Sequence, residues 1–121
     1  MPDSPLVQLR PDLVDGVAVV ELLPREITEP DQATLLGEAL RSVLEALPTK
    51  RLLIDAARTK YMSSTAFAVL LRFGLRVKEV GGTLAICAMD PFVRAGADIV
   101  KLGRIVPLFD DEPSALAALT A

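Results

Sequence analysis

Hydrophobic residues along this chain recur with two different spacings, and each spacing predicts one kind of element. Between Ser63 and Val80 the apolar side chains fall three or four positions apart, which is the repeat of a helix with one buried face. The residues on that face are Phe67, Leu70, Leu71, Gly74 and Val77. Gly81 and Gly82 follow, and glycine readily takes the left-handed conformation that ends helices. We therefore predict a helix over residues 63–80 with this face in the core.

An earlier helix is predicted from the same kinds of signal. Thr28 is expected to cap its free N–H groups, Pro30 suits its first turn, and Pro48 ends it. Its apolar side chains lie at helical spacing and are Leu36, Leu40, Val43 and Leu47. The acidic residues near its start favour the positive end of the helix dipole.

Two further helices are predicted in the last third of the chain. Asp90 and Pro91 provide an N-cap and a first-turn proline, and Gly103 marks the end of that helix. Its apolar side chains are Phe92, Val93, Ile99 and Val100. Asp111, Glu112 and Pro113 open the last helix, which extends through Leu119, and residues 110–112 are all acidic. We interpret their carboxylates as solvated capping groups, because three adjacent carboxylates need other ligands to hold a cation.

Short aliphatic and β-branched runs between these helices predict strands. The predicted strands are residues 6–9, 17–23, 51–56, 83–88 and 105–109. A turn at Asp15-Gly16 joins the first two into an antiparallel hairpin. Strands that alternate with helices pair in parallel. We therefore predict an α/β fold with a mixed, mainly parallel central sheet, an N-terminal antiparallel hairpin and about four helices. At this length one domain is expected, over residues 1–121.

Charge and hydropathy narrow the class of function. The 121 residues contain 13 Lys and Arg against 16 Asp and Glu, a net charge of −3. Arg72, Arg76 and Lys78 are spread along one segment and no basic block appears, so we expect no contact with nucleic acid or an anionic membrane. The first residues, Met1 to Ser4, show no signal-peptide pattern, and no apolar run is long enough to cross a membrane. We therefore expect a cytoplasmic protein.

The residues that usually carry catalysis or metal binding are scarce. The sequence has no histidine, and Cys87, its one cysteine, lies in an apolar run typical of a buried strand. Gly81-Gly82 follows a helix and not a strand, so no phosphate-binding loop is predicted. Asp55 ends a predicted strand, where it faces either a functional crevice or the following loop. We predict no metal, no cofactor and no catalytic residue.

Three consecutive hydroxyl side chains, Ser63, Ser64 and Thr65, stand at the start of the longest predicted helix. Serine is a favoured N-cap, so a structural role explains the run wherever the helix begins. The same place suits a phosphorylated residue, because free N–H groups and the helix dipole attract an anion. Both interpretations stay open on the residues alone.

Three motifs follow one another along the chain. They are Leu52-Leu53-Ile54-Asp55, then Tyr61-Met62-Ser63-Ser64-Thr65-Ala66-Phe67-Ala68, then Gly81-Gly82-Thr83-Leu84. Their order resembles that of the anti-sigma factor antagonists of the STAS domain family, and Pro91 and Leu102-Gly103 also fit. The resemblance covers about Val17 to Leu119 and implies a STAS-like fold.

The family's phosphorylated serine falls on Ser64 of this sequence. Its acidic residue just before the serine falls on Ser63, which is a departure from the pattern and leaves Ser63 and Thr65 as alternative acceptors. The family's two glycines fall on Ala66 and Ala68, and alanine keeps the helix favourable at both positions.

The resemblance implies a function in bacterial signal transduction and transcription regulation. The unphosphorylated domain binds an anti-sigma factor, usually also a serine kinase, and so releases a sigma factor. Phosphorylation ends the complex, and a serine phosphatase restores it. We expect a partner-binding surface at residues 63–65 that extends to Glu26 and Asp31, since loops at strand carboxyl ends form the usual functional edge of such sheets. ATP would belong to the partner.

Two other functions remain open. A STAS-like scaffold or sensory module would bind a protein or small ligand without a phosphorylation cycle, and the altered motif around Ser63 favours it. An α/β enzyme is disfavoured, because the sequence lacks histidine, a glycine-rich loop and a paired nucleophile and base.

Overall fold

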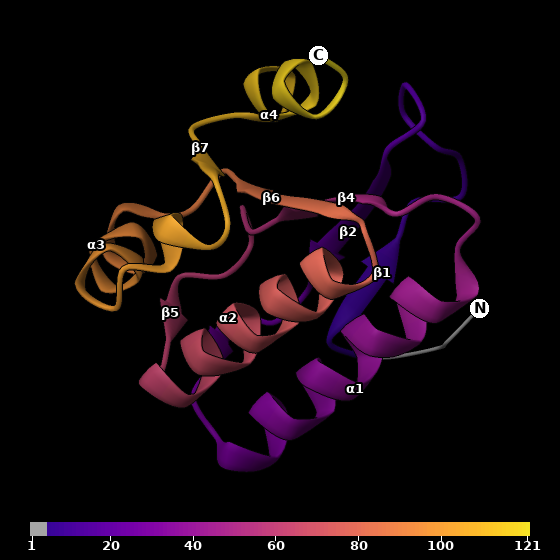
Figure 1. Ribbon diagram of the computed structural model, residues 1–121. Helices are drawn as coiled ribbons and strands as arrows, with labels where there is room; N and C mark the ends of the chain where they lie inside the picture. The colour runs from indigo at the N-terminus through magenta and orange to yellow at the C-terminus, as the bar shows by residue number, and fades with distance from the viewer. Residues whose placement is uncertain (1–4) are drawn as a thin grey trace.

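A computed structural model describes residues 5–121 of the chain (Figure 1). Met1 to Ser4, on which the signal-peptide prediction falls, lie outside the described residues. In chain order the elements are β1 (Val7–Leu9), β2 (Ala18–Leu22), β3 (Glu26–Ile27), α1 (Pro30–Ala46), β4 (Arg51–Asp55), β5 (Tyr61–Met62), α2 (Ser64–Glu79), β6 (Thr83–Cys87), α3 (Pro91–Ile99), the 3-10 helix η1 (Leu102–Arg104), β7 (Leu108–Phe109) and α4 (Glu112–Leu119).

Five strands form the central sheet in the order β1-β2-β4-β6-β7. The first two are antiparallel, with Val7 opposite Leu22, and the remaining neighbours are parallel. The predicted α/β fold, with its mixed, mainly parallel sheet, antiparallel hairpin and four helices, is therefore confirmed. Because β2, β4 and β6 run in the same direction, the segments that follow them begin at one edge of the sheet.

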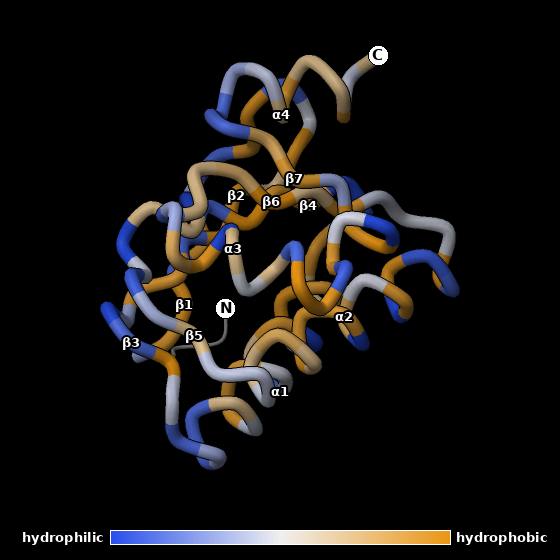
Figure 2. The backbone as a smooth tube through the Cα atoms, turned by 90° about the vertical axis from the view of Figure 1, so that its left-hand side faces the viewer, coloured by the Kyte–Doolittle hydropathy of each residue, from blue (hydrophilic) through white to orange (hydrophobic). Residues whose placement is uncertain are grey.

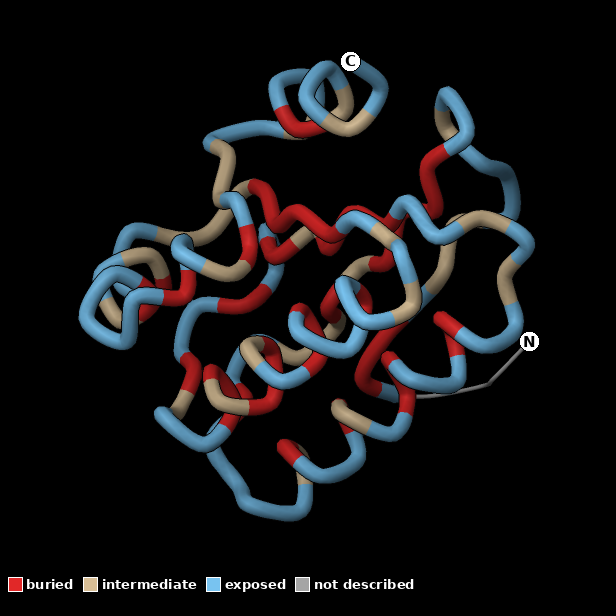
Figure 3. The backbone as a smooth tube through the Cα atoms, in the orientation of Figure 1, coloured by how far each residue is buried: buried red, intermediate tan, exposed pale blue. Residues whose placement is uncertain are grey.

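The two faces of the sheet build two hydrophobic clusters, since successive strand side chains point to opposite faces. Leu52 and Ile54 belong to the larger cluster, which includes residues of α1, α2 and α3. Leu53 and Cys87 belong to the smaller cluster, which is covered by Ala115 of α4. Figure 1 shows α1 and α2 on one side of the sheet and α4 on the other. The central strands are hydrophobic (Figure 2) and buried (Figure 3) between these layers.

The long helix α2 begins and ends as its sequence predicts. Phe67 and Leu70 are buried, Leu71 is only partly buried, and Phe73, which was not placed on the predicted face, is buried as well. Gly81 follows the helix with a φ of 78°, the left-handed conformation expected of it. The predicted buried face is therefore correct at its centre and differs at its edges.

The cap of α1 differs from the prediction. The N-cap is Glu29 and not Thr28, and the side chain of Gln32 accepts hydrogen bonds from the N–H groups of both residues at 3.0 Å. This pairing of the N-cap Glu29 with Gln32 three residues later is a capping box.

The segment after β6 shows the largest corrections. In α3 the side chains of Val93 and Ala97 are buried, but Phe92 and Ile99 are 81% and 80% exposed. The helix ends at Ile99, and Gly103 lies in η1 instead of ending α3. The last strand is shorter than the predicted 105–109, because the chain is still completing η1 at its first residue. Within residues 5–121 no helix has the length and hydrophobicity needed to cross a bilayer.

Candidate functional site

The three hydroxyl residues at the start of α2 have different environments. Ser63 is the N-cap, and its Oγ accepts a hydrogen bond from the N–H of Ala66 at 3.2 Å. Ser64 is the first residue of the helix, and Thr65 is the second; both are exposed. The structural interpretation of the run therefore applies to Ser63, while the hydroxyl of Ser64 makes no hydrogen bond to any described residue.

A small parallel pair of strands holds the start of α2 in place. Strands β3 and β5 pair with Glu26 opposite Tyr61, and neither strand was predicted from the sequence. The N–H of Ser63 donates to the carbonyl of Ile27 at 2.9 Å, which extends this pairing to the cap itself. Two-residue strands are too short to leave a periodic pattern, so sequence reasoning could not find them.

The loop before β5 is tied to the loop after β2 by a buried hydroxyl. The side chain of Thr59 is fully buried, and its Oγ1 donates to the carbonyl of Pro24 at 2.8 Å. The N–H of Lys60 donates to the carbonyl of Arg25 at 2.7 Å, and its ammonium lies 3.7 Å from Asp90 at the start of α3. These bonds join β2, β5 and α3 around the proposed site.

The two acidic residues predicted to extend the surface lie at the same end of the fold. Glu26 is exposed beside Tyr61, which is 54% exposed. Asp31 is exposed in the first turn of α1. The β3–β5 pair therefore brings Glu26 next to the segment that leads into Ser63, and α1 starts close behind β3 in the chain.

The remaining candidate groups have structural surroundings. Asp55 accepts a hydrogen bond from the N–H of Ala57 at 2.9 Å, so it holds the following loop. Arg10 lies 3.6 Å from that carboxylate, 3.3 Å from Glu21 and 2.6 Å from Glu112. Its hydrogen bond to Glu112 is the main cause that raises the pKa of Arg10. Its three ion pairs join β2, β4 and α4.

The thiol of Cys87 and the acidic cluster of residues 110–112 also have structural surroundings. Cys87 is fully buried, and burial raises the pKa of its thiol to about 12. Asp111 caps α4 by accepting from the N–H of Ser114 at 2.9 Å, and its hydrogen bonds with the side chain and then the backbone of Ser114 lower its pKa. In the described part of the chain, no three Cys, His, Asp or Glu side chains are placed to hold a metal ion.

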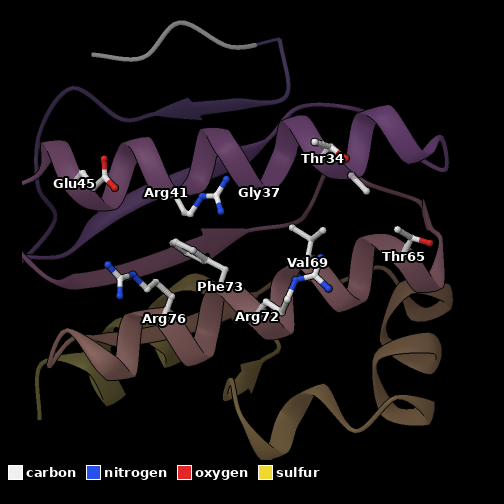
Figure 4. Close-up of a pocket in the computed structure, with 10 residues that line it drawn as sticks. Thr34, Gly37, Arg41, Glu45, Thr65, Val69, Arg72, Phe73 and Arg76 are labelled. Carbon is white, nitrogen blue, oxygen red and sulfur yellow. The ribbon is translucent and has the colours of Figure 1, made fainter.

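A groove of about 560 Å³ lies between α1 and α2 and was not predicted. Arg41 and Glu45 line it from α1, and Thr65, Arg72 and Arg76 line it from α2 (Figure 4). The three arginines form no block in the sequence. Two of the arginines are one helical turn apart in sequence, but only the packing of α1 beside α2 brings the third to them.

Comparisons with known proteins agree with this architecture. The family model described as STAS domain matches residues 31–115. The chain is 26% identical over 112 residues to a Bordetella bronchiseptica protein named "Putative anti-sigma factor antagonist BtrV", covering 93% of this chain and 94% of that protein. The structure of an anti-sigma factor antagonist from Mycobacterium paratuberculosis superposes with a TM-score of 0.79 at 25% identity, over 100% of this chain and 98% of the other.

A further structure, described as the anti-sigma factor antagonist SpoIIAA in its unphosphorylated form, has a TM-score of 0.73 at 16% identity, covering 93% of this chain and 95% of that chain, and shows the shared fold. The family match spans more than half of the chain. This chain therefore belongs to the STAS domain family, and proteins similar to it along most of their length are named anti-sigma factor antagonists.

Proposed function

We propose that this protein is an anti-sigma factor antagonist whose switch is phosphorylation of Ser64. The observation that carries the proposal is the separation of roles at the start of α2. Ser63 is occupied as the cap, while Ser64 presents an exposed hydroxyl one residue later. The names of the similar proteins support the choice of an anti-sigma factor as the partner.

The geometry favours Ser64 over the two alternative acceptors. A phosphate on Ser63 would have to leave the partly buried position in which its Oγ accepts from Ala66. Thr65 is exposed, but it also lines the groove between α1 and α2. Ser64 is therefore the acceptor that a kinase reaches with the least change of the fold.

Phosphorylation at Ser64 would switch binding without unfolding the domain. A phosphoserine adds about 1.5 to 2 negative charges at neutral pH. The free N–H groups at the start of α2 and the positive end of its dipole tolerate that charge on the isolated domain. In the complex, the anti-sigma factor would cover Ser64 with a surface formed around a neutral hydroxyl. The phosphate would there be desolvated without a compensating positive charge, which costs several kcal/mol. A cost of that size ends a complex of moderate affinity.

In this cycle the chain acts as substrate and ligand, and it catalyses nothing. The anti-sigma factor supplies the kinase and its ATP, and a serine phosphatase returns Ser64 to the binding form. The partner surface consists of residues 63–65 with Glu26 and Asp31. The whole chain, residues 1–121, serves as one domain in the cytoplasm.

Capture of the anti-sigma factor from the source cells, followed by incubation with ATP and mass spectrometry of residues 63–65, tests the proposal. Ser64→Ala is expected to bind the partner and resist phosphorylation. Ser64→Asp is expected to fold normally and lose partner binding. The matched control is Ser63→Ala, which should remain phosphorylated on Ser64. Phosphate found on Ser63 and not on Ser64 would show that the switch is Ser63 and that the assignment to Ser64 is wrong by one residue.

A second function is favoured by one observation, the hydroxyl of Ser63 where the family has an acidic residue. A scaffold or sensory module that binds its partner without phosphorylation would tolerate that change. If the captured partner and ATP leave residues 63–65 unmodified while the complex still forms, this second function replaces the first.

A further inference from the structure

The groove between α1 and α2 carries more positive charge than the chain as a whole. Three arginines and one glutamate line it, in a protein whose net charge is −3. Arg41 and Arg72 are exposed, and within residues 5–121 neither makes an ion pair. Arg76 is paired with Glu79 at 3.1 Å, but that glutamate is 67% exposed and such pairs are weak. The guanidinium groups of Arg41 and Arg72 are thus free to meet an outside anion, and Arg76 can exchange its weak pair for one.

The floor of the groove is apolar and its side is open. Ala33, Val69 and Phe73 are buried beneath it, and Gly37 brings the two helices close, since a Cβ there would lie 3.3 Å from Val69. From Thr65 to Arg76 the groove runs along about 17 Å of α2. This shape fits an elongated ligand better than a compact one.

The spacing of the arginines points to carboxylates on a polypeptide. Arg72 and Arg76 are neighbours on α2, one helical turn apart with about 5–6 Å between their Cβ atoms, and Arg41 faces them from α1 (Figure 4). One small anion would reach only part of this set. A segment with several acidic side chains places one carboxylate at each guanidinium, and arginine binds carboxylates through two parallel hydrogen bonds.

We infer that this groove is the docking site for an acidic segment of the anti-sigma factor, in addition to its contact at Ser64. The inference rests on the proposed function for the identity of the partner. Continuity supports it, because Thr65 belongs to the proposed partner surface and also lines the end of the groove. A partner bound at the start of α2 therefore lies directly beside the end of the groove.

Recognition is tested with fluorescein-labelled octaglutamate and, as a neutral probe, octaglutamine, using fluorescence anisotropy on the full chain. The groove variant is Arg41→Gln with Arg72→Gln. The control variant is Arg51→Gln with Arg104→Gln, which removes the same charge from two exposed residues outside the groove. Since all four side chains are exposed, circular dichroism should show unchanged folding in both variants.

We expect octaglutamate to bind the natural chain, with an affinity that falls as salt is added, and octaglutamine not to bind. The groove variant should lose about tenfold in affinity and the control variant less than about twofold. Equal losses in both variants, or no octaglutamate binding at all, would overturn the inference.

The same two variants are then measured against the purified anti-sigma factor beside Ser64→Asp. A loss of about tenfold in affinity for the anti-sigma factor in the groove variant, with no such loss in the control variant, supports the docking site. Loss of binding in Ser64→Asp with unchanged affinity in the groove variant overturns the inference and leaves the proposed function intact. Unchanged affinity in Ser64→Asp, with octaglutamate still dependent on Arg41 and Arg72, overturns the proposed function and supports recognition of acidic chains by the groove.

Discussion

The Oγ of Ser63 accepts a hydrogen bond from the N–H of Ala66 at 3.2 Å, and this bond defines where α2 begins. The next residue, Ser64, is therefore the first of the helix and keeps an exposed hydroxyl. Two adjacent serines thus have separate duties, one in stability and one in the proposed switch. Substitutions can test each duty on its own.

Substitution of the capping residue Ser63 should lower the stability of the fold, whereas substitution of Ser64 should not. Ser63→Ala is expected to reduce the free energy of unfolding by about 0.5–2 kcal/mol, because the N–H of Ala66 loses its acceptor. Ser63→Asp should retain most of the stability, since aspartate is an equally good cap. Urea denaturation measures both. If Ser64→Ala proves as costly as Ser63→Ala, the helix begins one residue later than described.

Truncation of a buried leucine on α2 should be costly. Leu70 is fully buried, and Leu70→Ala is expected to lower the free energy of unfolding by about 2–5 kcal/mol. Leu75, on the same helix, is 41% exposed, and Leu75→Ala should change it by about 0.5 kcal/mol or less. Similar losses in the two variants, measured by urea denaturation, would mean that the buried face is misassigned.

Two helical glycines should respond to alanine in opposite directions. A Cβ on Gly74 would lie 2.5 Å from a methyl group of Val106, which is fully buried and cannot move aside. Gly74→Ala is therefore expected to lower stability by about 1–3 kcal/mol. A Cβ on Gly37 meets Val69 at 3.3 Å, so Gly37→Ala should be neutral or stabilising by up to about 1 kcal/mol, from helix propensity. Thermal denaturation of both variants compares them directly, and a destabilised Gly37→Ala would contradict this ranking.

The thiol of Cys87 should be unreactive in the folded protein. Burial raises its pKa from 9.0 to about 12, so the reactive thiolate is nearly absent at about pH 8. Alkylation by iodoacetamide should follow global unfolding as urea is added. The unfolded chain loses this proton first, so the group's contribution to stability falls as pH rises from about 9 to about 12. Fast alkylation without urea would show that the sheet opens locally above the smaller cluster.

The acidic residues near the switch should contribute to partner binding. Glu26→Lys with Asp31→Lys is expected to weaken the complex by about threefold or more, through the loss of complementary charge. Asp12→Lys with Asp110→Lys is the matched control, because it reverses two exposed charges outside the proposed surface. Affinity for the captured partner is measured by titration calorimetry. If the Glu26→Lys, Asp31→Lys variant keeps its Kd while Ser64→Asp no longer binds, the partner surface is limited to the start of α2.

Elements that depend on neighbours in sequence were predictable. The α2 helix follows from its repeat of apolar residues and from the left-handed Gly81, and the caps at Asp90 and Asp111 follow from preferences of the first turn. The alternation of strands and helices was enough to predict a mainly parallel sheet. These features rest on contacts within a few residues, which leave a pattern in the linear order.

What the sequence did not determine depends on contacts between distant segments. The side chains of Phe92 and Ile99 look like core residues in sequence, but α3 turns Val93 and Ala97 inward instead, and Gly96 approaches the ring of Phe67 so closely that a Cβ would lie 2.8 Å from it. Helical periodicity does not say which neighbour will cover a helix, so exposure is decided by packing.

The site divides in the same way. The sequence by itself placed three hydroxyls at the start of a helix, because capping is a local preference. The choice of Ser64 among them came from the resemblance to the family. Only the tertiary structure assigned the cap to Ser63, whose Oγ accepts from the N–H of Ala66 and whose N–H donates to Ile27 in β3, and exposure to Ser64. Likewise Arg41 and Arg72, far apart in the chain, meet only when α1 packs beside α2, since the charge of a surface is set by which helices lie together.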